Sequence, residues 1–90
     1  MGAKAEIGWT RRLEDGTKLD VYAQHIGREW LFYSRTKRNE PWQRIKAPPL
    51  EDWLELLDAV ERMVPRRRYP PAELERLRQT IREKFPEAKP

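Results

Sequence analysis

The chain has 90 residues, of which 38% are charged and 38% apolar, and it contains no cysteine. This length allows one small hydrophobic core, and the lack of thiols excludes disulfides and thiolate metal sites. No stretch reaches the roughly 20 apolar residues of a membrane span, and the N-terminus lacks the apolar core of a signal peptide. We therefore expect a single small domain over residues 1–90, no membrane partner, and a cytoplasmic location that includes association with the nucleoid.

Positive charge is concentrated in the first half of the chain. Residues 1–47 hold ten Lys and Arg against six Asp and Glu, whereas residues 48–90 hold nine of each. Such a layout can steer a polyanion toward one part of the molecule. A solvated surface of mixed charge explains the same counts, so charge alone does not decide between the two interpretations.

Two alternating segments predict a β-hairpin near the start of the chain. Apolar and polar residues alternate over residues 5–13 and again over residues 18–26. Between them lies Glu14-Asp15-Gly16-Thr17, a turn sequence because Gly16 readily adopts the positive φ of a tight hairpin. We predict two antiparallel strands joined by this turn.

Two further strands follow. Gly27 allows a second turn, and residues 28–37 then form a third strand with the apolar centre Trp30-Leu31-Phe32-Tyr33. Asn39-Glu40-Pro41 ends this strand. Residues 42–46 suit a short fourth strand, because a proline is tolerated directly at a strand's start. The sequence therefore predicts a four-stranded antiparallel meander over residues 5–47.

The hydrophobic period changes after Pro48-Pro49. Apolar residues then recur every three or four positions, as on one face of an amphipathic helix: Leu50, Trp53, Leu54, Leu57, Val60 and Val64. Glu51 and Asp52 suit the first turn of this helix because carboxylates favour its exposed N–H groups. We predict a helix over residues 50–64 within the segment 48–65, and Pro65 ends it.

A second helix is predicted after a basic linker over residues 66–71. Its apolar residues lie at spacings of three and four: Leu74, Leu77, Ile81 and Phe85. This helix covers residues 72–85 and ends before Pro86. The fold class is therefore α+β, with a four-stranded antiparallel sheet followed by two helices in the order ββββαα.

One helix can cover only one face of a four-stranded sheet, so the second face requires another explanation. Alternation predicts that the helix meets five apolar or aromatic residues: Leu19, Val21, Leu31, Tyr33 and Ile45. The opposite face then receives aromatic and basic residues: Tyr22, Trp30, Phe32, Trp42, Arg12, Lys18, Arg44 and Lys46. Three more cations follow the third strand or end it: Arg35, Lys37 and Arg38.

Aromatic side chains interleaved with cations are what single-stranded nucleic acid requires, because unpaired bases stack on flat rings while cations follow the phosphates. We expect bases to stack on four aromatics: Tyr22, Trp30, Phe32 and Trp42. We expect phosphates to meet seven cations: Arg12, Lys18, Arg35, Lys37, Arg38, Arg44 and Lys46. Arg66, Arg67 and Arg68 are either a polar linker beside a helix C-terminus or a further phosphate clamp.

Several alternatives compete with nucleic-acid binding. The second helix could cover the aromatic face, or the face could be buried in a homodimer. The third strand could also be inverted, which would make Trp30 and Phe32 core residues. From a different functional class, the chain could be a small protein–protein adaptor whose aromatic face meets a protein partner, or a domain whose sheet holds no ligand.

The segment "GREWLFYSRTKRNEPWQRIKAPPLEDWLELLDAV" resembles the ββββα single-strand-binding modules of the Pur-alpha type and the related transcriptional positive cofactor four family. Gly27 precedes a strand that runs into the basic "SRTKRN", and "IKAPPLEDWLELL" resembles their passage from the fourth strand into the helix. Trp53 matches the aromatic position that packs on the sheet. The resemblance covers residues 5–64 and implies single-stranded DNA or RNA binding, usually as a dimer. Residues 66–85 are an addition to that pattern.

Catalytic and metal-binding signals are weak. His25 is the only histidine, and no cysteine exists to pair with it. Glu51, Asp52, Glu55 and Asp58 fall at helical spacings but fit a solvated face better than a metal site. No glycine-rich phosphate loop is present. We therefore expect no enzyme activity, no cofactor and no metal, with single-stranded nucleic acid and a second copy of the chain as partners.

Overall fold

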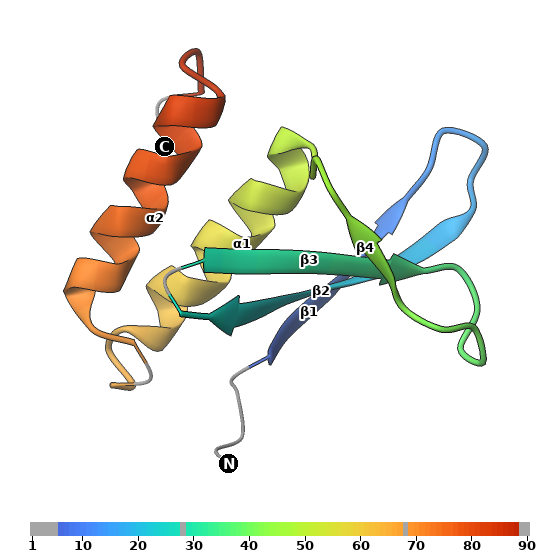
Figure 1. The fold of residues 1–90 in the computed structure, drawn as a ribbon, viewed down its shortest axis with the longest axis horizontal. Coiled ribbons are helices and arrows are strands. Elements are labelled where there is room, and N and C mark those ends of the chain that lie inside the picture. Colours follow the sequence, from blue (N-terminus) through green and yellow to red (C-terminus); the bar gives the residue numbers. More distant parts are fainter. Residues whose placement is uncertain (1–5, 28, 68, 89–90) are drawn as a thin grey trace. The chain divides into compact units, whose positions relative to one another are not determined.

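A computed structural model describes residues 6–27, 29–67 and 69–88. The elements follow the order ββββαα (Figure 1): β1 Glu6–Arg12, β2 Lys18–Ile26, β3 Glu29–Arg35, β4 Gln43–Ile45, α1 Leu50–Met63 and α2 Pro71–Lys84. This order confirms the predicted α+β fold class. The chain divides into two compact units, Met1–Pro48 with the sheet and Pro49–Pro90 with the helices.

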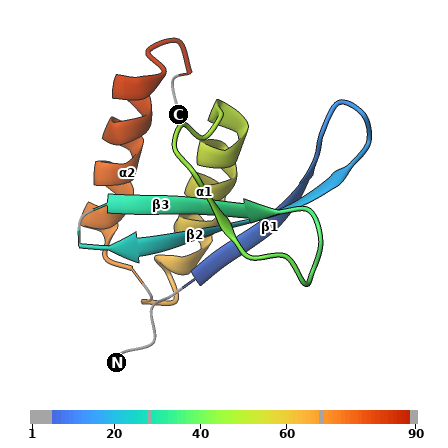
Figure 2. The same ribbon diagram turned by 45° about the vertical axis from the view of Figure 1, so that its right-hand side comes forward.

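The sheet is a meander in which each strand pairs with the next in antiparallel orientation (Figures 1 and 2). In the first hairpin Gly16 has a φ of 90°, and the Thr17 N–H donates a hydrogen bond of 2.9 Å to Asp15 Oδ1. In the second hairpin Gly27 has a φ of 63°, and Ile26 pairs with Glu29. Because Ile26 and Glu29 pair across this short connection, the register of β2 against β3 is fixed.

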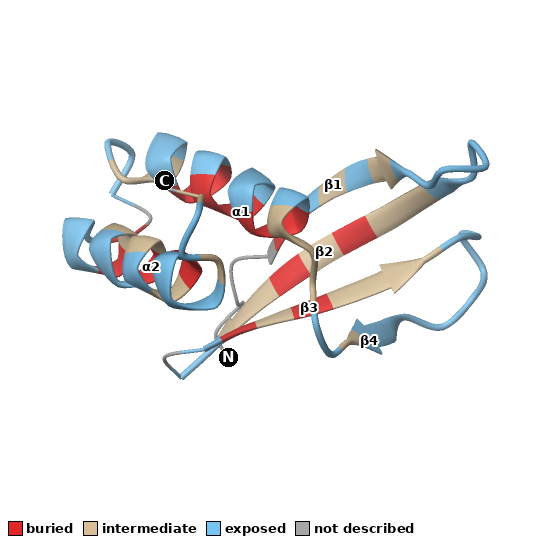
Figure 3. Cartoon of the chain, turned by 90° about the horizontal axis from the view of Figure 1, so that it is seen from above, coloured by how far each residue is buried: buried red, intermediate tan, exposed pale blue. Residues whose placement is uncertain are grey.

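The two faces of the sheet differ in burial. Ile7, Val21, Ala23 and Phe32 are all at most 4% exposed. The register places Ile7 opposite Ala23 and Ala23 opposite Phe32, so these side chains share what we call the buried face. Figure 3 shows buried positions as separate bands along β2 and β3. Because side chains alternate along a strand, the residues between these positions point to the other side, the open face.

The predicted face assignment of the third strand is wrong. Trp30 and Phe32 were predicted on the binding face, but they are 9% and 1% exposed and pair with His25 and Ala23 of the buried face. Tyr33, predicted in the core with Leu31, pairs with Tyr22 on the open face. The physical reason is that a strand that is apolar at every central position carries no alternation, so its phase is set by the hairpin register alone.

The helical unit is bounded by prolines, as predicted. Pro49 and Pro70 precede the two helices, and Pro71 occupies the first turn of α2, where a missing N–H costs nothing. α1 and α2 contact each other within this unit, and Arg78 of α2 joins Glu61 of α1 at 2.8 Å. The buried positions of α1 are Asp52, Trp53, Leu56, Leu57, Ala59 and Val60.

Two details of the predicted α1 stripe are corrected. Leu54 was placed among the apolar stripe residues but is 41% exposed, and Asp52 was placed on the solvated face but is 0% exposed. The buried stripe is therefore rotated toward Asp52 and Leu56 relative to the predicted one. The spacing of apolar residues shows that the helix is amphipathic. Because the apolar stripe of α1 is wide, however, the spacing does not decide which residues at the edges of the stripe are buried. Among the described helices, none is both long and apolar enough to cross a membrane.

Candidate nucleic-acid interface

Three aromatic rings form one cluster on the open face. Tyr22 and Tyr33 are cross-strand partners, and their ring centroids lie 4.9 Å apart with the planes inclined by 18°. Trp42, from the segment before β4, meets Tyr22 edge-on, with centroids 4.6 Å apart and an angle of 84°. Stacked and edge-to-face contacts at these separations hold the rings in fixed orientations. We call Tyr22, Tyr33 and Trp42 the aromatic cluster.

A cation is part of this cluster. Arg35 lies at the end of β3, and its Cζ atom is 4.2 Å from the centroid of the Trp42 ring. A guanidinium at this distance is attracted to the negative face of the indole. Trp42 is nevertheless 36% exposed, so part of its ring remains open to a ligand.

The loop before Trp42 is braced by one carboxylate. Glu40 accepts a hydrogen bond of 2.7 Å from the Thr36 hydroxyl, and bonds of 3.3 Å and 3.2 Å from the N–H groups of Thr36 and Lys37. These donors, the Thr36 hydroxyl foremost, hold the pKa of the Glu40 carboxyl below its ordinary value, since they stabilise its charged form. Glu40 thereby closes the loop directly ahead of Pro41 and Trp42.

Basic residues surround the aromatic cluster on the same face. Arg44 pairs with Tyr33, while Arg12 and Lys18 pair with each other at the hairpin end of β1 and β2. Arg12 Nη1 also donates to the carbonyl of Gly16 at 3.1 Å. Between described residues, no ion pair involves Arg12, Lys18, Arg35 or Arg44. Their charges are therefore not neutralised by partners within the described part of the chain.

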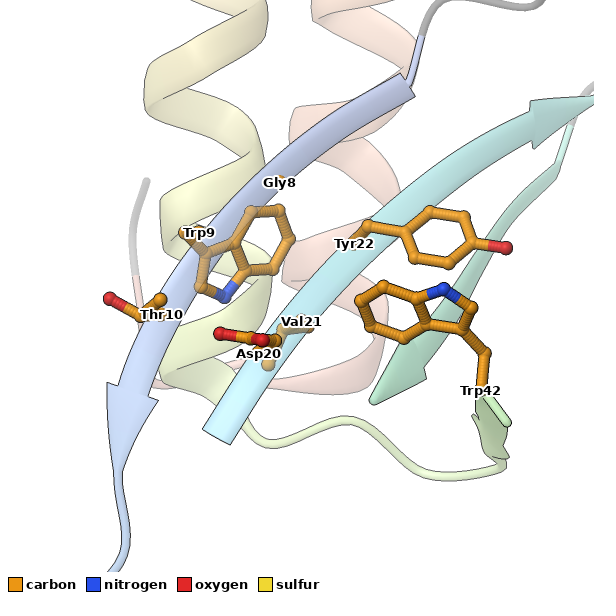
Figure 4. A pocket seen from close by; sticks show the side chains of 7 residues that line it. All are labelled: Gly8, Trp9, Thr10, Asp20, Val21, Tyr22 and Trp42. Atoms are coloured by element: carbon orange, nitrogen blue, oxygen red, sulfur yellow. The ribbon is translucent and has the colours of Figure 1, made fainter. Parts of the chain in front are cut away.

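A pocket of about 580 Å³ lies beside the aromatic cluster. Its lining comes from β1, β2 and the segment before β4 (Figure 4): Gly8, Trp9, Thr10, Asp20, Val21, Tyr22 and Trp42. Gly8 pairs with Tyr22, and Thr10 pairs with Asp20, so these four positions share the open face. Gly8 contributes no side chain, which leaves the space beside Tyr22 empty. The pocket therefore has an aromatic wall and a polar wall.

The structure brings together part of the predicted site. Six predicted residues lie on the open face or against it: Tyr22, Trp42, Arg12, Lys18, Arg35 and Arg44. Lys37, Arg38 and Lys46 are exposed, the first two in the β3–β4 loop and the third one residue after β4. Trp30 and Phe32 are not part of this surface. Arg66 and Arg67 are exposed in the helical unit, and Arg68 lies outside the described residues.

Sequence reasoning missed Tyr33 and the polar wall of the pocket. The signal for Tyr33 was available, because Gly27 predicts a tight connection, and the pairing of Ile26 with Glu29 then places Tyr22 opposite Tyr33. Thr10 and Asp20 gave no such signal, because polar residues on an exposed strand face are common.

The remaining predicted features are ordinary. His25 is a half-buried strand residue whose ring stacks on Trp30, with centroids 4.4 Å apart and an angle of 26°. Among the described residues, no group of three or more His, Asp or Glu could hold a metal ion.

Comparison with protein-family models, with curated proteins and with solved structures finds no match to this chain.

Proposed function

We propose that the open face binds single-stranded nucleic acid. The observation that supports this function most directly is the aromatic cluster, because three rings in mutual contact gather on one sheet face among cations that form no ion pair with another described residue. Unpaired bases offer flat faces to such rings, and each stacked base contributes about 1–3 kcal/mol. The stacking residues in this proposal are Tyr22, Tyr33 and Trp42; Trp30 and Phe32 are no longer among them.

The cations provide the second part of the proposal. Arg35 and Arg44 adjoin the aromatic cluster, and Arg12 with Lys18 extends the charge along the β1–β2 hairpin. Lys37, Arg38 and Lys46 add exposed charge near the β3–β4 end. Phosphates that follow this path release counterions, so the affinity falls as the salt concentration rises. Duplex nucleic acid meets the same charges but keeps its bases inside the helix.

The resemblance to Pur-alpha-type modules supports the same function on a separate ground, the sequence pattern over residues 5–64. It also supports a homodimer, the usual assembly of those modules. No catalytic step, cofactor or metal enters this proposal. Stacking on these rings tolerates every base and does not depend on the sugar, so the proposal includes both DNA and RNA.

A fluorescence-anisotropy titration tests the proposal. Labelled single-stranded and duplex oligonucleotides of one sequence are titrated with the protein at two salt concentrations. We expect the single strand to bind more tightly than the duplex at both concentrations, with a salt-dependent affinity for each. Equal affinity for both forms would indicate a general polyanion surface and contradict stacking.

A protein adaptor is the second candidate, and one observation favours it. Tyr22, Tyr33 and the 36% exposed Trp42 gather on one face of the sheet, and aromatic residues are enriched in protein–protein interfaces. If the protein bound no oligonucleotide even at low salt, the open face would instead be a protein interface. The titration therefore separates the two candidates.

A further inference from the structure

The pocket beside the aromatic cluster contains a carboxylate, Asp20, although the proposed ligand is a polyanion. Asp20 lies on β2, half-buried, opposite both Thr10 of β1 and Arg35 of β3. It forms no ion pair with any described residue. A negative charge here repels phosphates, so it weakens binding unless the ligand brings a hydrogen-bond donor to it. In a nucleotide such donors are the N–H groups of the base and the hydroxyl groups of the sugar.

The shape of the pocket favours a base. Its volume of about 580 Å³ falls within the range of small-ligand sites, roughly 300–1,000 Å³. Tyr22 and Trp42 form one wall, while Thr10 of β1 and Asp20 of β2 lie on the other side (Figure 4). Arg35 occupies one face of the Trp42 ring, so a ligand in the pocket meets the rest of that ring. A flat, partly aromatic molecule with a polar edge matches these walls.

Gly8 makes this pocket possible. It pairs with Tyr22, and an added Cβ would lie 3.4 Å from the carbonyl oxygen of Val21 and 3.8 Å from Tyr22 Cβ. Both are ordinary van der Waals separations, so the backbone accepts a side chain at this position. The glycine is therefore not required for the strand itself, and a larger residue here would fill the space beside Tyr22.

We propose that this pocket holds one base of the bound strand and that Asp20 accepts a hydrogen bond from the exocyclic amino group of that base. This inference rests on the proposed function and adds base selectivity to it. Cytosine and uracil differ at two adjacent positions on this edge: cytosine carries an amino group at C4 and an acceptor nitrogen at position 3, whereas uracil carries a carbonyl oxygen at C4 and an N–H at position 3. An ionised carboxylate has acceptors only, so it attracts the amino group and repels the carbonyl.

The test compares oligocytidine with oligouridine of equal length in anisotropy titrations at neutral pH. These ligands match in size, charge and sugar, so the ratio of their dissociation constants reports the edge that carries the amino group in cytosine. We expect oligocytidine to bind about tenfold more tightly, which corresponds to one charge-assisted hydrogen bond. Asp20→Asn should reduce this ratio to within about twofold, because an amide can donate to the carbonyl as well as accept from the amino group.

Two further variants serve as controls. One tests whether the loss of any negative charge changes the ratio, and the other tests the pocket without a substitution at Asp20. Glu14→Gln removes the same charge from the β1–β2 turn, outside the pocket lining, and should keep the tenfold ratio. Gly8→Val leaves Asp20 in place but fills the pocket, and should abolish the ratio while oligouridine still binds. This second variant keeps the proposal testable if Asp20→Asn does not fold.

The outcomes are distinguishable. If the wild-type protein binds both oligonucleotides equally, the pocket does not select amino groups, but single-strand binding stands. If neither oligonucleotide binds, the proposed function itself fails and the inference with it. A third result also overturns the inference: Asp20→Asn changes the preference between ribose and deoxyribose strands but leaves the cytosine-to-uracil ratio unchanged. Asp20 would then contact the sugar.

Discussion

At the scale of single residues, the two faces of the sheet should respond differently to substitution. Trp42 is 36% exposed on the open face, and Phe32 is 1% exposed on the buried face. Trp42→Ala should weaken single-strand binding by about 1–3 kcal/mol and leave the unfolding free energy nearly unchanged. Phe32→Ala should lower the unfolding free energy by about 3–5 kcal/mol. Anisotropy titration and chemical denaturation of both variants check this; unfolding of Trp42→Ala at room temperature would show that Trp42 is a core residue.

Removal of a basic residue from the open face should change the salt dependence of the binding affinity. Arg44 pairs with Tyr33 and is exposed, so its removal should cost one phosphate contact. Arg44→Ala should therefore reduce the slope of log affinity against log salt concentration by about 0.7. Arg82→Ala, at an exposed position of α2, serves as the charge-matched control and should leave the slope unchanged. An equal change in both variants would mean that the protein responds to net charge and not to a defined path of phosphates.

The face of the sheet on which a side chain lies could be predicted only where polar and apolar residues alternate. Tyr22 and Val21 lie in a strand of clear alternation, and both were assigned to the correct face. Trp30, Phe32 and Tyr33 lie in a run without alternation, where composition cannot select a face. The pocket could not be predicted at all, because it depends on the absence of a side chain at Gly8 next to a ring from a different strand.

At the scale of elements, the β3–β4 loop links acidity to the position of Trp42. Hydrogen bonds from Thr36 and Lys37 hold the pKa of Glu40 below its ordinary value in the folded protein. A lowered folded pKa means that the ionised carboxylate stabilises the loop above the unfolded pKa, and that this contribution is lost as the pH falls through the folded pKa. The loop should therefore loosen under acidic conditions.

Glu40→Gln tests this linkage. Thermal unfolding is followed from neutral pH to below the ordinary pKa of a glutamate, in wild type and variant. We expect the wild type to lose more stability than the variant as the pH falls, because the variant has no carboxyl group to protonate. Asp15, whose pKa is lowered by the Thr17 N–H, contributes in the same window to both proteins, so only their difference reports Glu40. Parallel pH profiles would contradict a bracing role for Glu40.

The turn after α1 contains a backbone conformation that favours glycine. Arg67 has a φ of 60°, in the left-handed region that a non-glycine residue enters at a cost of about 1–2 kcal/mol. Arg67→Gly should therefore relieve this strain and raise the unfolding free energy, but only by up to about 1 kcal/mol, because the larger entropy loss of glycine on folding offsets part of the gain. Arg66→Gly removes the same charge at a position without positive φ and should not stabilise the protein. Denaturation curves compare the two, and equal effects would argue against strain at Arg67.

Element boundaries were predicted well wherever prolines and glycines mark them. The ends of both helices and both tight hairpins match the structure within one or two residues, because Pro and Gly restrict the backbone directly. The fourth strand is shorter than predicted, Gln43–Ile45 instead of residues 42–46. Trp42 lies just before the strand, and its ring packs on Tyr22 and Arg35, tertiary contacts that no local pattern encodes.

At the scale of the whole molecule, charge is divided between the two compact units. The excess of cations lies in Met1–Pro48, and Pro49–Pro90 is balanced. This division was evident in the sequence, since it requires only counting. It concentrates the electrostatic attraction for a polyanion in the unit that also holds the aromatic cluster.

The edges of the sheet motivate the last prediction, a homodimer. β1 is one edge strand, and on the other side the β3–β4 pairing covers only Phe32, Tyr33 and Ser34, short of the first three residues of β3. Exposed strand edges are sites where a second chain can pair. Sedimentation velocity at micromolar concentration should give a dimer, and a clean monomer would contradict the prediction.

A dimer presents two open faces. An oligonucleotide long enough to reach both faces should therefore bind more tightly than one about half as long, and the difference should exceed the statistical gain from its larger number of binding positions. Trp42→Ala should weaken the long oligonucleotide more than the short one, because each dimer then loses two stacking rings.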